Sequence, residues 1–286
     1  MVSPLLRSCR PAFWLAAALT ALCACAPAAS RGPAGNAAGI TSSASAPAPR
    51  AAQASSPQAQ APRQVQAPQQ AQAPSLQAAF SPEGVAWSDG RQACVARVPQ
   101  LRPVCPPWPA PTGAVGWNAG RAWTTLPTLG QAVTLDGAAE SLPAGRVVAM
   151  SATRIYREDG SALNYSGAPV PGTLGRPAQV VTGGDGRDYA LVAGRLWAVD
   201  SGRSEPAGGG RWLQPTPDGA RAAIFPSVET SQGRLELRGT QVFAAGSDTP
   251  LPLPGPARAL GMVGMEPYVL VGSAGDWQLI SLTRRV

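Results

Sequence analysis

Short apolar runs alternate with polar turn residues from about Ser75 to the C-terminus of the chain. None of these runs keeps the period of an amphipathic helix, and most are rich in Val, Leu, Ile and aromatic residues. Runs of this kind, bounded by Gly, Pro, Asp or Asn, are typical of β-strands. The pattern predicts strands at residues 85–88, 93–98, 114–118, 121–126, 131–136, 147–151, 155–157, 179–182, 189–192, 196–200, 212–214, 222–225, 235–237, 242–244, 260–263, 268–271 and 277–282.

A similar tight turn follows a strand at several points along this part of the chain. Asp-Gly and Asn-x-Gly sequences supply the positive φ that hairpin turns require. These turns lie at residues 87–90, 117–120, 157–160, 183–186, 216–219 and 273–276. Many short strands without helices indicate a β-sandwich, barrel or propeller, and the repeated turn favours a propeller over residues 75–286.

Two segments resemble known propeller repeats. Residues 217–225, Pro-Asp-Gly-Ala-Arg-Ala-Ala-Ile-Phe, resemble the core of the WD40-like repeats of TolB-type envelope proteins, with Thr216 in place of the usual Ser. Residues 194–202, Gly-Arg-Leu-Trp-Ala-Val-Asp-Ser-Gly, resemble the blades of PQQ-type propellers. The resemblance implies an all-β propeller of about six small blades; the alternatives are five or seven blades, or a β-sandwich. We expect residues 75–80 to add an outer strand to the last blade and close the ring.

The first residues of the chain have the order of an export signal. Basic Arg7 and Arg10 precede an apolar run over residues 12–24 that only Thr20 interrupts. This run is shorter than the roughly 20 residues that span a bilayer as a helix. We therefore predict a cleaved signal peptide over residues 1–24.

The sequence Leu-Cys-Ala-Cys at residues 22–25 resembles the lipobox of bacterial lipoproteins. The resemblance implies that the leader is cut before Cys25, that Cys25 is acylated, and that it anchors the chain to the lipid bilayer. Ala26 follows in place of Asp, which implies transport to the outer membrane in a cell that has one. Cys23 departs from the usual pattern, and the alternative is an ordinary secretory signal cut at a nearby Ala.

Residues 25–74 are rich in Ala, Pro, Gln and Ser and contain no aromatic residue. A segment of this composition buries too little apolar surface to offset the entropy of an ordered chain. We therefore expect a disordered tether between the anchor and the β-propeller domain at residues 75–286.

The net charge of +7 does not indicate a nucleic-acid partner. Most of the excess lies in the leader and the tether, whereas acids and arginines are interspersed and nearly balanced in the folded segment. No basic stripe is therefore available to follow a phosphate backbone, and we expect no nucleic acid as a partner.

The chain contains neither His nor Lys. Imidazole bases, His metal ligands, Schiff-base lysines and P-loop lysines are therefore excluded. From this we expect that the protein is not an enzyme and that it has no catalytic residues, cofactor or metal site. The alternative is a metal-carboxylate-dependent hydrolase or lactonase-like propeller, which needs only acids that converge on one channel.

Cys94 and Cys105 are the cysteines of the folded segment. If residues 99–100 form the tip of a hairpin, the register places these two cysteines opposite each other on adjacent strands. We predict a disulfide between them, which fits an oxidising compartment. A metal site is the alternative, but two cysteines without His supply too few ligands.

Tryptophans recur close to the predicted strands, and we expect most of them to pack between blades. These are Trp87, Trp117, Trp123, Trp197, Trp212 and Trp277. Trp108 lies instead in a Pro-rich loop, Cys-Pro-Pro-Trp-Pro at residues 105–109. Exposed aromatic side chains on loops are frequent binding residues, so Trp108 is our candidate for an exposed contact.

These observations together predict an extracytoplasmic lipoprotein of the cell envelope. Its propeller is expected to bind or scaffold an envelope protein or glycan, because propeller faces present many loops in a fixed geometry.

The first prediction concerns the N-terminus. Mass spectrometry of the mature protein should find Cys25 as an acylated first residue. Cys25→Ser should abolish the modification, whereas Cys23→Ser should leave it in place. An unmodified N-terminus at any other residue would contradict the lipobox interpretation.

Overall fold

The computed structural model describes residues 76–135, 140–172, 174–273 and 275–283. The predicted signal peptide (residues 1–24) and tether (residues 25–74), and with them Cys25, lie outside the described residues. Strands and one short 3-10 helix, η1 (Val199–Ser201), make up the regular structure of the described part. No helix in that part is long and apolar enough to cross a bilayer.

Among the described residues, hydrogen bonds group the strands into six sheets of three or four strands and one hairpin of two. The first two sheets are β1 (Gln77–Ser81), β2 (Gly84–Ser88), β3 (Ala93–Arg97) and β4 (Pro103–Val104), then β5 (Val115–Asn118), β6 (Arg121–Leu126), β7 (Gln131–Thr134) and β8 (Ser141–Pro143). The next two are β9 (Val147–Met150), β10 (Ile155–Arg157), β11 (Ala162–Leu163) and β12 (Pro169–Val170), then β13 (Gln179–Thr182), β14 (Asp188–Val192), β15 (Arg195–Ala198) and β16 (Arg203–Pro206). The hairpin is β17 (Trp212–Thr216) and β18 (Gly219–Ala223), and the last two sheets are β19 (Ser227–Thr230), β20 (Gly233–Arg238) and β21 (Gln241–Ala244), then β22 (Ala257–Val263), β23 (Glu266–Ser273) and β24 (Asp276–Ser281).

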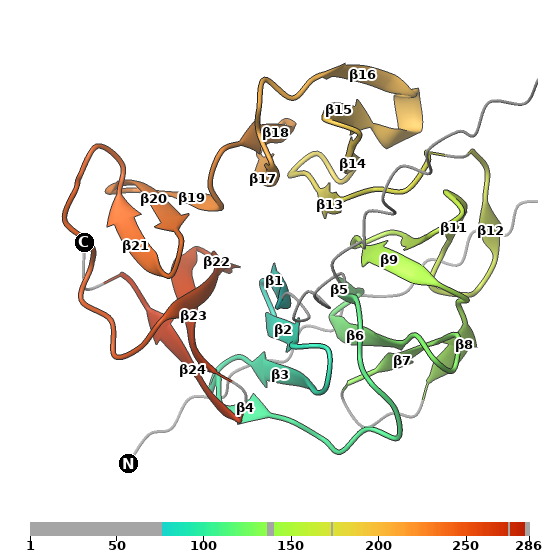
Figure 1. Ribbon diagram of the computed structural model, residues 1–286, viewed down its shortest axis with the longest axis horizontal. Coiled ribbons are helices and arrows are strands. Elements are labelled where there is room, and N and C mark those ends of the chain that lie inside the picture. Colours follow the sequence, from blue (N-terminus) through green and yellow to red (C-terminus); the bar gives the residue numbers. More distant parts are fainter. Residues whose placement is uncertain (1–75, 136–139, 173, 274, 284–286) are drawn as a thin grey trace, which may run out of the picture. The chain divides into compact units, whose positions relative to one another are not determined.

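The six sheets are the blades of a β-propeller (Figure 1). Their first strands lie side by side round the ring: β1 contacts β5, β5 contacts β9, β9 contacts β13, β19 contacts β22, and β22 returns to β1. The two-stranded hairpin lies between the fourth and fifth blades and packs against β13 and β14. The predicted all-β propeller of about six small blades is confirmed.

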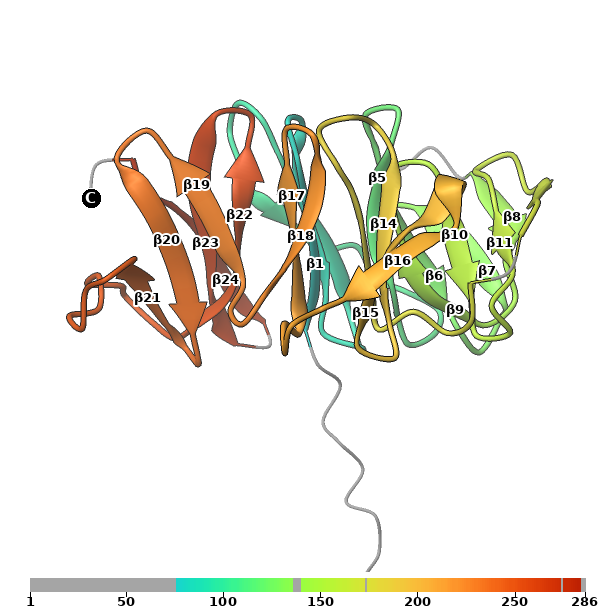
Figure 2. The ribbon, with the colours of Figure 1, turned by 90° about the horizontal axis from the view of Figure 1, so that it is seen from above.

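The turns gather on two faces of the ring (Figure 2). We call the face at which β1 begins the N-terminal face, and the other the opposite face. Backbone hydrogen bonds on the N-terminal face join turns of the same sheet, for example from Ala144 to Gly130 and from Leu174 to Gly160, and the bond from Ala257 to Thr240 joins the sixth sheet to the fifth. On the opposite face, the backbone N–H of Gly184 donates to Thr216.

Apolar side chains fill the spaces between neighbouring blades. Trp117 and Val115 of the second blade pack with Ala86 and Val95 of the first. Other clusters join the second blade to the third, the third to the fourth, and the fifth to the sixth. Neighbouring blades are therefore held together mainly by apolar burial between their large faces.

Every predicted strand overlaps a strand of the structure, but several short strands were not predicted. β4, β8, β12 and β16 are outermost strands of two to four residues, and each contains a proline. Proline lacks an N–H but is tolerated in an edge strand. Strands as short as these have too few residues to show an alternation of apolar and polar positions. The turn at residues 216–219 has a counterpart at residues 81–84, Ser-Pro-Glu-Gly, between β1 and β2.

The predicted closure of the ring is wrong. The strand near residues 75–80 is β1, and it pairs with β2 of its own blade rather than with the last blade. The last blade keeps three strands. Its β22 packs against β1 instead, where Gly261 leaves room for the ring of Phe80.

Gly84, at the turn between β1 and β2, has no room for a side chain. Its φ is +149°, and a Cβ there would lie 2.1 Å from the carbonyl oxygen of Ala96. Gly84→Ala should therefore lower the free energy of unfolding by about 2 to 4 kcal/mol. Gly167, with a φ of +83° and no atom within 4 Å of its Cβ position, is the matched control, and Gly167→Ala should cost about 1 kcal/mol. Urea unfolding measures both, and equal losses would contradict the steric argument.

Candidate functional site

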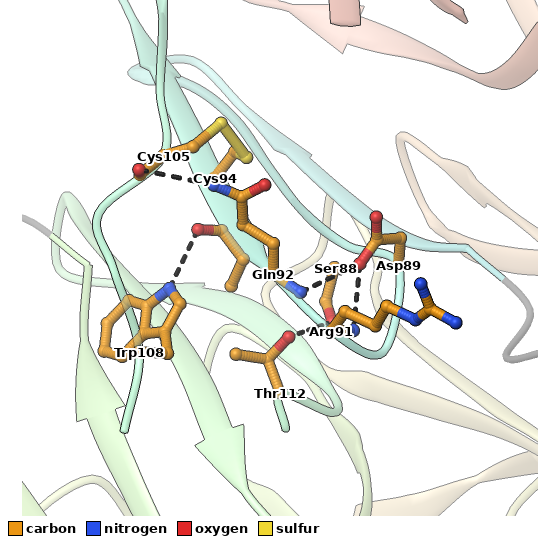
Figure 3. Close-up of a disulfide and its surroundings, with 9 residues drawn as sticks. Ser88, Asp89, Arg91, Gln92, Cys94, Cys105, Trp108 and Thr112 are labelled. Atoms are coloured by element: carbon orange, nitrogen blue, oxygen red, sulfur yellow. Dashed lines mark hydrogen bonds between the residues drawn. A yellow bond between two sulfur atoms is a disulfide. The ribbon is translucent and has the colours of Figure 1, made fainter. Parts of the chain in front are cut away.

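The predicted disulfide is present in the first blade (Figure 3). Cys94 and Cys105 are bonded, with their Cα atoms 4.2 Å apart. In the adjoining ladder Val95 pairs with Val104, which is the register predicted from the hairpin. Cys94 is fully buried between the first and last blades, so the bond ties the loop after β4 to a buried strand.

Trp108 is not the exposed residue that the sequence predicted. Its indole N–H donates a hydrogen bond to the carbonyl oxygen of Ala93, 3.0 Å away, and the ring packs against the cluster between the first two blades (Figure 3). The side chain is therefore half-buried and anchors the Pro-rich loop. A contact role for Trp108 stays a prediction.

A buried carboxylate joins the third blade to the fourth on the opposite face of the ring. Asp188, at the start of β14, is 1% exposed. Three hydroxyls of the third blade donate to its Oδ2: Ser151 at 2.6 Å, Thr153 at 2.7 Å and Tyr156 at 2.8 Å. Thr182 donates to Oδ1 at 2.8 Å. Because four hydroxyls surround this carboxylate, it braces the two blades against each other.

Two tyrosines next to this carboxylate are held in their neutral form. Burial, then the charge of Asp188, raises the pKa of Tyr156 far above its ordinary value. The same two causes raise the pKa of Tyr165, whose hydroxyl donates to the carbonyl oxygen of Ser151 at 2.7 Å. Both phenols therefore remain hydrogen-bond donors at any physiological pH.

A cavity of about 210 Å³ adjoins the Asp188 network. Arg187, Asp200 and Ser201 line it with charged and hydroxyl groups, together with Asp188 and Ala198. Asp200 accepts a hydrogen bond and ion pair from Arg154 of the third blade. Burial of Arg154 lowers its pKa, but the hydrogen bond to Asp200 and the charges of Asp200 and Tyr156 together outweigh burial, so the pKa of Arg154 is raised. We call the cavity lined by residues 187, 188, 198, 200 and 201 the blade-four cavity.

The blade-four cavity has polar groups that are fixed before any ligand arrives. Asp188 is held by four hydroxyls, and Asp200 by a guanidinium from another blade. A site of this kind can exchange hydrogen bonds with the hydroxyl, amide or charged groups of a polar ligand.

The alternative of a metal-carboxylate hydrolase needs several acids in one place. Among the residues that the structure describes, no three Asp, Glu or Cys side chains gather closely enough to hold a metal ion. A second cavity, about 180 Å³, lies in the last blade and offers the single carboxylate of Asp276. Neither cavity is lined by three acids among the described residues.

Comparison with known proteins finds similarity of fold alone. No protein-family model and no curated protein matches the sequence. Solved structures that match include virginiamycin B lyase from Staphylococcus aureus, at 12% identity and a TM-score of 0.36, over 75% of this chain and 87% of that one. A streptogramin B lyase matches at 12% identity and a TM-score of 0.37, over 74% and 84% of the two chains. PorZ, a surface component of the type-IX secretion system of Porphyromonas gingivalis, matches at 13% identity and a TM-score of 0.36, over 70% of this chain and 32% of that one.

These structures correct one expectation. We inferred from the missing His and Lys that the protein is not an enzyme, but two of the matching propellers are lyases. A propeller fold is therefore compatible with catalysis, and the exclusion does not stand. At this level of identity no activity is carried over to this chain.

The sequence pointed to only part of this site. The turn predicted at residues 183–186 is present, and Asp185 is an ordinary turn residue that accepts a hydrogen bond from the backbone N–H of Arg187. Asp188 is instead a buried brace, because its partners come from the turn between β9 and β10, more than thirty residues earlier. The ion pair between Arg154 and Asp200 likewise spans two blades, and no local pattern indicates it.

Asp188→Ala tests the brace. The change leaves four hydroxyls, three of them on the third blade, without their acceptor, so unfolding free energy should fall by about 3 kcal/mol or more. Asp218→Asn, at an exposed turn on the same face, should change it by less than about 0.5 kcal/mol. Thermal or urea unfolding measures both variants. A loss in Asp188→Ala as small as in Asp218→Asn would show that the network contributes little.

Proposed function

We propose that this protein is an envelope lipoprotein whose propeller is a binding module for a polar envelope ligand, either a glycan or a protein segment. The observation that carries the proposal is the blade-four cavity, whose acid, guanidinium and hydroxyl groups are fixed in advance by contacts between two blades. Such preorganisation lowers the entropic cost of binding.

Export supports the same proposal. The disulfide between Cys94 and Cys105 fits an oxidising compartment, as found outside the cytoplasm. The leader, the lipobox-like segment ending at Cys25 and the polar tether over residues 25–74 fit attachment to the outer side of a membrane. The ligand would then be a component of the envelope that the tethered propeller reaches.

The test is crosslinking in intact cells followed by affinity purification of the tagged full chain from membranes. The wild-type protein should recover the same protein or glycan reproducibly. Arg187→Ala with Asp200→Asn should reduce recovery several-fold, because these changes remove two of the three charged side chains that line the cavity. Asp218→Asn, on the same face but outside the cavity lining, is the matched control and should retain full recovery.

Two results would overturn the proposal. Equal recovery by the cavity variant and the control would place binding elsewhere, and Trp108→Ala would then test the Pro-rich loop. A ligand that is released in chemically altered form would show turnover rather than stable binding, and the cavity would have to be interpreted as a catalytic site.

A further inference from the structure

The β17–β18 hairpin exposes apolar side chains on the N-terminal face. Trp212 is 43% exposed, Ile224 66% and Phe225 38%. Trp212 begins β17, and Ile224 and Phe225 follow the end of β18. The backbone N–H of Arg211 donates to the carbonyl oxygen of Ala223 at 2.9 Å, so both ends of the hairpin lie together. We call Arg211, Trp212, Ile224 and Phe225 the Trp212 patch.

The exposure follows from the small size of this sheet. In the fourth blade, β14 also pairs with β15, and β15 pairs with β16, whereas β18 pairs with β17 alone. The outer strands that flank such residues in a complete blade are missing here. The sequence predicted that Trp212 packs between blades, and this is wrong because the hairpin has no further strands to cover it.

Arginines accompany the apolar residues on this face. Arg211 is exposed, and the guanidinium of Arg238 lies 5.7 Å from the ring centre of Phe225. Other arginines on turns and near strand ends of the N-terminal face are Arg91, Arg146, Arg157, Arg176, Arg195 and Arg258, and its acids are Asp89, Glu158, Asp159, Glu205, Asp276 and Glu236, which pairs with Arg238. Arg146 and Arg176 share Glu158 as their ion-pair partner, which leaves basic charge in excess.

The opposite face has the reverse balance on the turns between first and second strands. These turns and the strand residues that flank them carry Glu83, Asp185, Asp218 and Glu266, with Arg121, Arg154 and Arg187 as their arginines. The remaining turns of this face hold both signs, with Glu140, Asp200 and Asp248 against Arg97, Arg102 and Arg203. The N-terminal face therefore carries a small excess of basic charge, and the opposite face does not. A surface of negative charge would attract the N-terminal face and repel the other.

We propose that the N-terminal face rests on an anionic lipid surface, with the Trp212 patch inserted at the headgroup level. This proposal rests on the membrane attachment proposed above. Trp and Phe beside Arg are the side chains that favour the boundary between headgroups and acyl chains. Arginines near a bilayer are drawn to anionic headgroups.

The direction of the chain favours lipid over a protein partner as the occupant. β1 begins on the N-terminal face, so the segment that precedes it, with the proposed anchor at Cys25, joins the propeller on the side of the Trp212 patch. An anchored chain keeps the membrane at a high effective concentration, so even a small patch is sufficient for contact.

Hydrogen exchange on the full chain, purified from membranes and reconstituted into vesicles, tests the proposal. One vesicle set is phosphatidylcholine alone, and the other is equal parts phosphatidylcholine and phosphatidylglycerol. Amides at residues 211–213 and 223–225 should exchange several-fold more slowly on the anionic vesicles than on the neutral ones. High salt should remove the difference, because it screens the attraction between arginines and headgroups.

The variant Trp212→Ser with Phe225→Ser should lose this protection. The matched control is Val98→Ser with Met265→Ser, which removes exposed apolar side chains near the turns of the opposite face and should keep it. Unchanged circular dichroism and melting would show that both variants are folded. Equal exchange on the two vesicle sets, or protection at residues 98 and 265 instead, would overturn the proposal. Protection that appears only when a membrane protein extract is added would assign the patch to a protein and also overturn it.

The mass of the N-terminal peptide separates this proposal from the anchor. If the chain is unacylated but still sediments with anionic vesicles and is protected at the patch, the lipid-facing surface is supported and the anchor is contradicted. If the chain is acylated but shows no protection at the patch, the anchor is supported and the lipid-facing surface is contradicted.

Discussion

Side-chain packing between the first blade and the last holds this ring together. Among the described residues, each strand pairs only within its own sheet, so no strand is shared across the closure. The ring of Phe80 occupies the space over Gly261, and Trp87 meets Trp277 edge to face with ring centres 6.4 Å apart. Cys94 lies in the same cluster, so its bond to Cys105 fastens the chain at the place where the ring must close. The closure therefore depends on shape and apolar burial, which a change of side-chain volume disturbs directly.

One junction in the ring is built differently. The β17–β18 hairpin shares an apolar cluster with the fourth blade, but its side chains contact the fifth blade through polar groups. Gln214 accepts hydrogen bonds from Ser227 at 2.8 Å and from Arg221 at 3.0 Å, and Arg221 also pairs with Glu229. Polar contacts of this kind contribute less to the free energy of folding than apolar burial does. We therefore expect this junction to open before the others. The truncated sheet thus explains both a weaker junction and the exposed Trp212 patch beside it.

The sequence predicted what depends on local pattern and missed what depends on partners from elsewhere in the chain. The strands followed from apolar runs, and the pairing of Cys94 with Cys105 followed because a short turn fixes the register of a hairpin. The closure was wrong, because the sequence of β1 does not indicate which neighbouring strand it pairs with. The exposure of Trp108 was wrong because its Pro-rich loop folds back to the carbonyl oxygen of Ala93. The environment of Asp188 could not be derived, since three of its hydroxyl donors come from another blade.

The two proposals place different ligands on the two faces of one rigid ring, and the strand order makes this arrangement consistent. First strands rise from the N-terminal face, so the turns beside Asp188 and Asp200 lie on the opposite side from the Trp212 patch. Contact with lipid through the patch would therefore turn the blade-four cavity away from the membrane, towards the space where a polar ligand is found. The acidic turns on that face would add to this orientation, because anionic headgroups repel them. A propeller held in this way would need no conformational change to present its cavity, since the braces between the third and fourth blades already fix its lining.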